Sequence, residues 1–259
     1  MTLAYIVLAT LAGGLLSVTI AAGLTVSLLS RLVPQLVSLS TGVLLGTALL
    51  SVLPEAFEGQ SHPQPLFLTL LGGLLFFFFL EKVELYRHSH HHEGDGHDHH
   101  HHFDQEQAGR GGLSVLVGDS IHNFCDGALI AVAFLADTQL GWMTAIAIVA
   151  HEIPQEVGDY LVLLNAGFSR ARALAYNALS GLAAVAGGVL GYFLIQPFQE
   201  LLPYLMVVAA SSFIYVAVAD LIPQLQRRLP WRATLMQIVW LVVGLGVVGL
   251  LLLERGHAH

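Results

Sequence analysis

Residues 141–166 read GWMTAIAIVAHEIPQEVGDYLVLLNA, an apolar run with a compact polar patch in its middle. The run is long enough to cross a bilayer as an α-helix, which needs about 20 residues. Its polar patch, HEIPQEVGD, covers residues 151–159. A carboxylate near the bilayer centre costs about 2.5 to 3.5 kcal/mol on insertion scales. A segment that carries several of them therefore needs a specific compensation.

The rest of the chain is as apolar as this run suggests. Its 259 residues are 55% hydrophobic and 11% charged, whereas soluble domains carry about 25% charged residues. Eight apolar runs have spanning length, and they cover residues 3–30, 36–56, 65–86, 112–135, 141–166, 170–195, 201–223 and 232–254. The sequence predicts an all-α integral membrane protein of eight transmembrane helices, with residues 1–259 forming a single transmembrane domain.

The distribution of positive charge predicts the orientation in the membrane, because Lys and Arg accumulate in short cytoplasmic loops. All but Arg255 fall on one side of an eight-helix arrangement: Arg31, Lys82, Arg87, Arg110, Arg170, Arg172, Arg227, Arg228 and Arg232. We therefore expect both termini outside, in a plasma membrane or a bacterial inner membrane. The net charge of -8 argues against a nucleic-acid partner, and a single cysteine, Cys125, excludes an internal disulfide framework.

One long connection, residues 87–111, contains nine histidines and several acidic residues but no apolar run. It is predicted to be a disordered cytoplasmic loop. Neutral imidazoles beside carboxylates favour weak, exchangeable metal binding there. The alternative is a solvated linker without a metal.

Two polar faces can meet in the middle of the membrane. An α-helix turns by about 100° per residue, so polar residues three and four apart share a face. The connection 136–141 is too short for anything but antiparallel neighbours. The residues that we expect at one depth are His122, Asn123, Asp126, His151, Glu152 and Gln155. Pro154 has no N–H, so it should kink its helix and free a carbonyl near Ala150 within the cluster.

The donor types indicate a divalent transition-metal ion. Imidazole, carboxylate and amide groups together suit Zn²⁺, Fe²⁺ or Mn²⁺, whereas Cu⁺ would need more sulfur and Mg²⁺ or Ca²⁺ only oxygen. Asn123 and Gln155 could instead support the ligands from behind. Glu156 and Asp159 stay open between a second metal, a proton relay and hydrogen bonds between helices. For Asp119 and Asp220, an exit path competes with a simple interfacial role.

The sequence also contains a weak internal repeat. SVLPE at 51–55 and DLIPQ at 220–224 place a proline at the same offset. Helices 1 to 3 and 6 to 8 would then be repeats of opposite sense around helices 4 and 5, an arrangement common in secondary transporters.

The segments HNFCDG (122–127) and HEIPQEVGD resemble signature segments of the ZIP family of divalent-metal transporters, closest to its LIV-1 branch. FIYVAVADLIPQ at 213–224 and the His-rich loop are also similar to that family. The resemblance implies inverted three-helix repeats around helices 4 and 5 and zinc or iron influx toward the cytoplasm. It also implies a paired metal site built from the six residues named above.

Three departures from that pattern matter. Gln155 stands where the branch usually has His, which leaves iron and zinc both open. Cys125 stands where more distant members have Pro, so helix 4 should be straighter. The large extracellular domain of many LIV-1 members is missing, which leaves a homodimer possible without their dimerisation module.

Two other functions compete with ion uptake. HEIPQ differs by one residue from the H-E-x-x-H pattern of metalloproteases, but Gln155 removes the second zinc-binding His and Pro154 disturbs the helix. A metal exporter of another class could use the same acids. We expect a transporter and not an enzyme, with Zn²⁺ (or Fe²⁺ or Mn²⁺) as the transported substrate, carried by alternating access.

Overall fold

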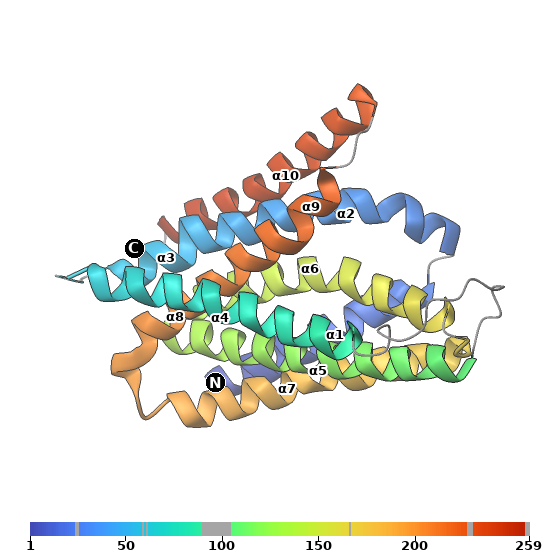
Figure 1. Ribbon diagram of the computed structural model, residues 1–259. Coiled ribbons are helices and arrows are strands. Elements are labelled where there is room, and N and C mark those ends of the chain that lie inside the picture. The colour runs from blue at the N-terminus through green and yellow to red at the C-terminus, as the bar shows by residue number, and fades with distance from the viewer. Residues whose placement is uncertain are drawn as a thin grey trace.

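A computed structural model of the protein describes residues 1–23, 26–58, 60, 62–89, 105–165, 167–226 and 230–256. These residues form helices joined by short connections, and they contain no strand (Figure 1). The elements are α1 (Thr2–Gly23), α2 (Val26–Gly46), η1 (Thr47–Val52), α3 (Leu53–Phe57), α4 (Gln64–Ser89), α5 (Gln105–Ala136), α6 (Thr138–Asn165), α7 (Arg170–Ile195), η2 (Gln199–Leu201), α8 (Leu202–Tyr215), η3 (Val216–Leu221), α9 (Ile222–Leu225) and α10 (Trp231–Gly256).

Helix length and composition indicate a multi-pass membrane protein. Within the described residues, six stretches are long and apolar enough to cross a bilayer: Thr2–Ile20, Leu32–Phe57, Gln64–Lys82, Arg170–Ile195, Gln199–Leu225 and Trp231–Leu253. Helices α5 and α6 fall outside this set because their polar residues lower their hydropathy. The expectation of an all-α membrane protein is confirmed, whereas the count of eight crossings stays a prediction.

The predicted first span, 3–30, is wrong at its end. Helix α1 stops at Gly23 and α2 already begins at Val26, so Arg31 belongs to a helix and not to a connection. Residues 24–30 are as apolar as those before them, and only Gly23, a residue type that often ends helices, marked the boundary.

The His-rich connection is shorter than predicted at both ends. Helix α4 continues to Ser89 and α5 starts at Gln105, where Gln, Glu and Ala favour a helix. Residues 90–104, which carry eight of the nine predicted loop histidines, lie outside the described residues.

The helices form two groups that pack against each other. Helices α1, α5, α6 and α7 contact one another and make up the site group; the second group pairs α2 with α10 and α4 with α8. Figure 1 shows α2 and α10 along the upper edge and α5 and α7 along the lower edge. Contacts of α2 with α6 and of α5 with α8 join the groups. The central pair α5 and α6 thus belongs to one group and faces the other.

Small residues set the close approach of the helices. A Cβ built on Gly187 of α7 would lie 1.9 Å from the Phe124 carbonyl oxygen of α5, and one built on Gly42 of α2 would lie 2.2 Å from the Leu241 carbonyl oxygen of α10. Helix α7 therefore presses directly on the backbone of α5 and holds it in place.

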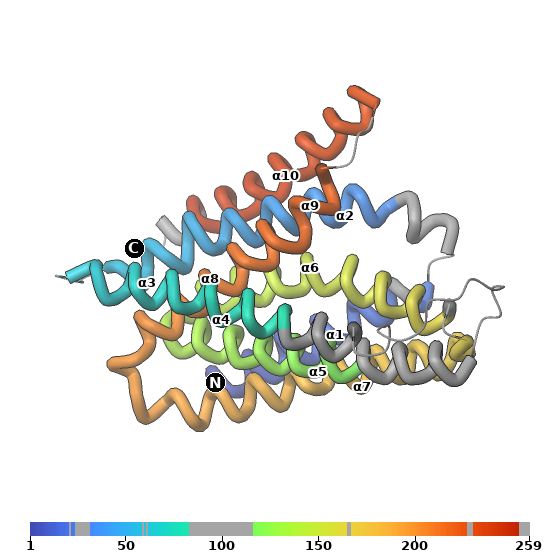
Figure 2. Tube along the Cα trace, in the orientation of Figure 1, coloured from blue at the N-terminus to red at the C-terminus, as the bar shows by residue number. Residues whose placement is uncertain are grey.

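Two π-helical segments occupy matching places in the chain. Both η1 and η3 have six residues, and each is followed by a short helix with proline in its first turn, Pro54 or Pro223. Both prolines and both π-helical segments are separated by 169 positions. Figure 2 shows α2 continuing through η1 into α3, and α8 through η3 into α9, as two similar paths.

Candidate metal centre

A very short turn holds the two central helices side by side. Helix α5 ends at Ala136 and α6 starts at Thr138, with only Asp137 between them. The Asp137 carboxylate accepts a hydrogen bond from the Leu140 backbone N–H at 2.9 Å, which caps the start of α6. The two helices are in contact, as the short connection predicts.

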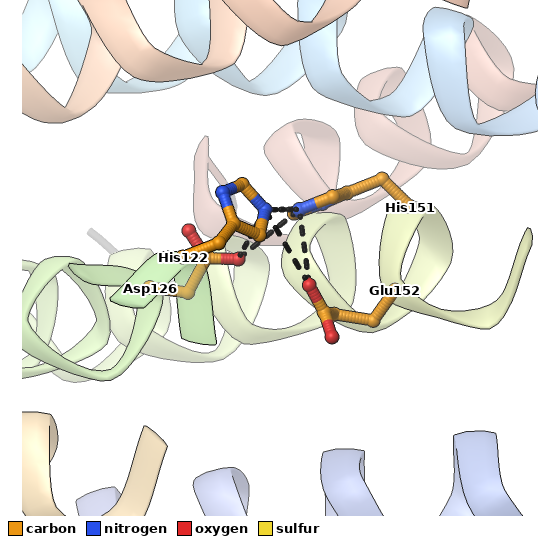
Figure 3. Close-up of side chains that lie close together, drawn as sticks. All are labelled: His122, Asp126, His151 and Glu152. Carbon is orange, nitrogen blue, oxygen red and sulfur yellow. Dashed lines mark hydrogen bonds and ion pairs between the residues drawn. The ribbon is translucent and has the colours of Figure 1, made fainter. Parts of the chain in front are cut away.

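Four of the six predicted site residues converge (Figure 3). His122 and Asp126 come from α5, and His151 and Glu152 come from α6. We call them the four-residue cluster. The His151 Nε2 atom lies 3.1 Å from Asp126 Oδ2, 3.3 Å from His122 Nε2 and 3.5 Å from Glu152 Oε1. The His122 Nε2 atom lies 3.6 Å from Glu152 Oε1 and 3.7 Å from Asp126 Oδ2. Two nitrogen atoms and two oxygen atoms therefore surround one small space.

Three of the four cluster residues are buried. Asp126, His151 and Glu152 are all buried, whereas the His122 side chain is 27% exposed. Within the described part of the chain, neither Asp126 Oδ2 nor Glu152 Oε1 accepts a hydrogen bond of good geometry. Buried carboxylate oxygens are costly in that state, so the cluster favours a positively charged occupant.

A backbone contact orients the His151 ring. Its Nδ1 atom lies 3.2 Å from the Ala147 carbonyl oxygen. A carbonyl only accepts hydrogen bonds, so Nδ1 carries the proton and donates. In the neutral ring, the Nε2 lone pair then points into the four-residue cluster, as in metal-binding histidines.

Asn123 and Gln155 lie beside the cluster and turn their amide nitrogens to Asp119. The Asn123 Nδ2 atom donates to Asp119 Oδ1 at 3.1 Å, and Gln155 Nε2 donates to the same oxygen at 3.2 Å. Both predicted ligand residues thus hold a neighbouring carboxylate. This arrangement favours the alternative in which they support the ligands from behind.

A second acidic group adjoins the first. Carboxylate oxygens of Asp119, Glu152 and Glu156 lie within 4.8 Å of one another, so Glu152 belongs to both groups. Glu156 is fully buried, and neither of its oxygens has a hydrogen-bond partner among the described residues. The sequence left Asp119 and Glu156 without an assigned role. Their four-residue spacing from Asn123 and Glu152 was the available signal.

Pro154 lies inside α6, and the carbonyl that it frees has a side-chain partner. The Ser40 hydroxyl of α2 donates a hydrogen bond to the Ala150 carbonyl oxygen. The prediction of a freed carbonyl near Ala150 is confirmed. Ser40 itself was missed, because nothing in the sequence distinguishes it from other serines in the apolar helices.

Comparison with known proteins identifies the family of this chain. A family model described as ZIP zinc transporter matches residues 1–102 and 83–252. The chain is 37% identical to zinc transporter ZIP10 of Danio rerio over 150 residues, which cover 55% of this chain and 18% of the relative. It is 32% identical to zinc transporter ZIP13 of Pongo abelii over 232 residues, 83% of this chain and 65% of the relative.

A third relative, zinc transporter ZIP6 of Pongo abelii, is 38% identical over 111 residues, 43% of this chain and 15% of the relative. The matched part of the chain spans less than two thirds of each of these three relatives. All three names are those of transporters and not of enzymes. Because the family model covers nearly the whole chain, the chain belongs to the ZIP zinc transporter family.

Proposed function

We propose that this chain carries divalent transition-metal ions, foremost Zn²⁺, across a membrane toward the cytoplasm, and that the four-residue cluster binds the ion on its way. Membership of the ZIP family supports metal transport, and the zinc transporters among its relatives support zinc. Fe²⁺ and Mn²⁺ accept the same imidazole and carboxylate donors, so they are the further candidates.

The spacing of the donor atoms is the observation that carries this proposal. Zn²⁺ binds nitrogen and oxygen at about 2.0 to 2.1 Å, which puts the ligand atoms of a tetrahedral site about 3.3 Å from one another. The separations between the cluster's imidazole nitrogens and between these and the carboxylate oxygens run from 3.1 to 3.7 Å. A cation at their centre would satisfy both buried carboxylates and both Nε2 atoms at once.

The donor set also suits an ion that is released again. The cluster holds no thiolate, the donor that binds Zn²⁺ most firmly in structural sites. The partly exposed His122 ring offers a way in and out, whereas a structural zinc would be closed off. We therefore assign the cluster to a transported ion.

The second acidic group extends the site to a pair of positions. Glu152 belongs to both groups, and Asn123 and Gln155 hold Asp119 at the border between them. The six proposed site residues are His122, Asn123, Asp126, His151, Glu152 and Gln155. Asp119 and Glu156 provide oxygen donors for an ion that passes or pauses beside the first position.

We further propose that the ion moves by alternating access. The four-residue cluster comes entirely from the site group, so that group could slide against α2, α4, α8 and α10 without pulling the ligands apart. The two π-helical segments are 169 positions apart, and so are the prolines that follow them. This supports two inverted repeats, one made of α1, α2 to α3 and α4, and the other of α7, α8 to α9 and α10.

The placement in the membrane completes the proposal. Residues 1–259 form one transmembrane domain of eight crossings, in a plasma membrane or a bacterial inner membrane. Both termini lie outside and the His-rich loop is cytoplasmic, as the distribution of Lys and Arg favours. Helix α1 begins and α10 ends toward the same side of Figure 1, which agrees with an even number of crossings.

Zinc uptake into liposomes tests the function. Purified protein should bring Zn²⁺ to an enclosed zinc-sensitive dye, and His122→Ala and His151→Ala should each reduce the rate at least tenfold. His62→Ala is the matched control, since His62 is an exposed histidine between α3 and α4. Equal uptake by the two cluster variants and the parent would refute the assigned site, and no uptake by the parent would refute the function.

A further inference from the structure

The Ala150 carbonyl is a weak point in the backbone of α6. In a regular helix it would accept a hydrogen bond from the N–H four residues later, but that residue is Pro154, which has none. Inside a membrane a freed carbonyl needs another donor, because lipid offers none. Ala150 directly precedes His151, so the donor that it finds also bears on the four-residue cluster.

The donor comes from the other helix group. Ser40 of α2 is fully buried, and its hydroxyl donates to the Ala150 carbonyl oxygen. Helix α2 contacts α6 along this face, whereas the cluster ligands all belong to α5 and α6. This hydrogen bond therefore crosses the boundary between the two groups, next to the candidate metal centre.

The hydroxyl has a second acceptor within its own helix. Ser40 Oγ lies 2.7 Å from the Leu36 carbonyl oxygen, one turn earlier in α2. A hydroxyl has a single proton, so it donates to one of the two carbonyls at a time. If α6 moves away, Ser40 turns its proton to Leu36 and remains satisfied, as serines in membrane helices commonly are. When the two helices separate, only the Ala150 carbonyl then loses its hydrogen-bond partner.

We propose that Ser40 is a positioning residue that holds the site group in the conformation described here. Its hydroxyl is an exchangeable partner: it binds the Ala150 carbonyl while α6 lies against α2, and it passes to Leu36 when the site group moves. Ser40 touches no cluster side chain in this role; it acts on the backbone beside His151. This inference rests on the proposed transport function.

A double-mutant cycle between Ser40→Ala and Pro154→Ala tests the contact. Alanine at position 154 restores an N–H, so the Ala150 carbonyl regains a donor within α6 and no longer depends on Ser40. The matched control is Ser38→Ala. Ser38 is also fully buried on α2, and its hydroxyl donates to the Pro34 carbonyl of its own helix at 2.8 Å.

Two measurements follow each variant: the zinc dependence of uptake into liposomes and the thermal unfolding of the purified protein. With Pro154 present, Ser40→Ala should change the maximal uptake rate by about two- to tenfold, the range expected for one net hydrogen bond. The zinc concentration at half-maximal rate should change less, since no ligand is altered. Unfolding should occur at a lower temperature. With Ala at 154, Ser40→Ala should change the uptake rate by less than about twofold.

The effects of Ser38→Ala should be the same in both backgrounds. Equal effects of Ser40→Ala in both backgrounds, or effects no larger than those of Ser38→Ala, would overturn the proposal. If the parent moves no zinc at all, the proposed function fails, yet the unfolding cycle still reports whether Ser40 and Pro154 are coupled. The two failures are therefore distinguishable.

Discussion

Replacing Asp126 by Asn should distinguish two quantities: the stability of the zinc-free protein and the binding free energy of the ion. Asp126 is 2% exposed, and its Oδ2 atom lies 3.1 Å from His151 Nε2 without a hydrogen bond of good geometry in the described structure. Asn has nearly the same shape but no charge. Removing one partner of a buried charge pair costs about 3 to 5 kcal/mol, so zinc should bind about 10²- to 4 × 10³-fold more weakly.

The same substitution should leave the zinc-free protein as stable as the parent or more stable, because it removes a buried carboxylate. At a zinc concentration 100 times the parent Kd, zinc stabilises the parent by about 2.7 kcal/mol. A 10²-fold weaker variant would gain only about 0.4 kcal/mol under the same condition. The two proteins should therefore differ in their response to zinc far more than in their stability without it.

Thermal unfolding of the purified protein, with and without zinc, measures both quantities. The comparison should be made with residues 88–102 deleted in every variant, so that the histidines of that segment do not bind zinc as well. His62→Ala in the same background controls for the loss of an unrelated histidine side chain. If Asp126→Asn kept the full stabilisation by zinc, the ion would not bind at the four-residue cluster, and the site assignment would be wrong.

Three further predictions concern other parts of the chain. Deleting residues 88–102 should leave the zinc uptake rate of liposomes within about twofold of the parent, because the proposed ion path lies in α5 and α6; complete loss of uptake would contradict this. Gly187→Ala puts a Cβ 1.9 Å from an α5 carbonyl oxygen and should lower the unfolding free energy by about 1 to 3 kcal/mol. Gly246→Ala, with nothing within 4 Å of the added Cβ, should not lower it in the same unfolding assay. Tyr215→Phe removes the hydroxyl that donates to the Glu81 carboxylate between α8 and α4, and should lower the unfolding free energy by about 1 kcal/mol; an unchanged unfolding midpoint would show that this bond adds no stability.

The helices and the four-residue cluster could be predicted from the sequence because both depend on local patterns. Long apolar runs mark the helices, and polar residues at helical spacing inside two of them mark one face on each. The short connection predicted at 136–141 then makes the two helices antiparallel neighbours, which brings His122 and Asp126 beside His151 and Glu152. The freed Ala150 carbonyl was predictable too, since it follows from the chemistry of Pro154 alone.

Other features depend on contacts that local patterns do not record. The break after Gly23 separates two equally apolar stretches, so hydropathy could not find it. Ser40 and Ala150 are 110 positions apart, and serine is common in apolar helices. The amide side chains of Asn123 and Gln155 can present either an oxygen or a nitrogen to a neighbour. Only the position of Asp119 decides that the nitrogens are used as donors here.

All four cluster residues come from two adjacent helices of one helix group, and this placement has a physical reason. A transported ion needs its ligands to stay together while its access to water changes. Donors on α5 and α6 meet this need, because a one-residue connection and the close packing of α7 hold the two helices together. If the groups slide as proposed, a ligand on α2 would be pulled away from the others, and a buried charge would be left without a partner. The bond that Ser40 makes across the boundary has no such cost on the α2 side, since the hydroxyl can return to Leu36. In the proposed mechanism the charged ligands therefore stay within the site group, and a neutral, exchangeable hydrogen bond joins this group to the other.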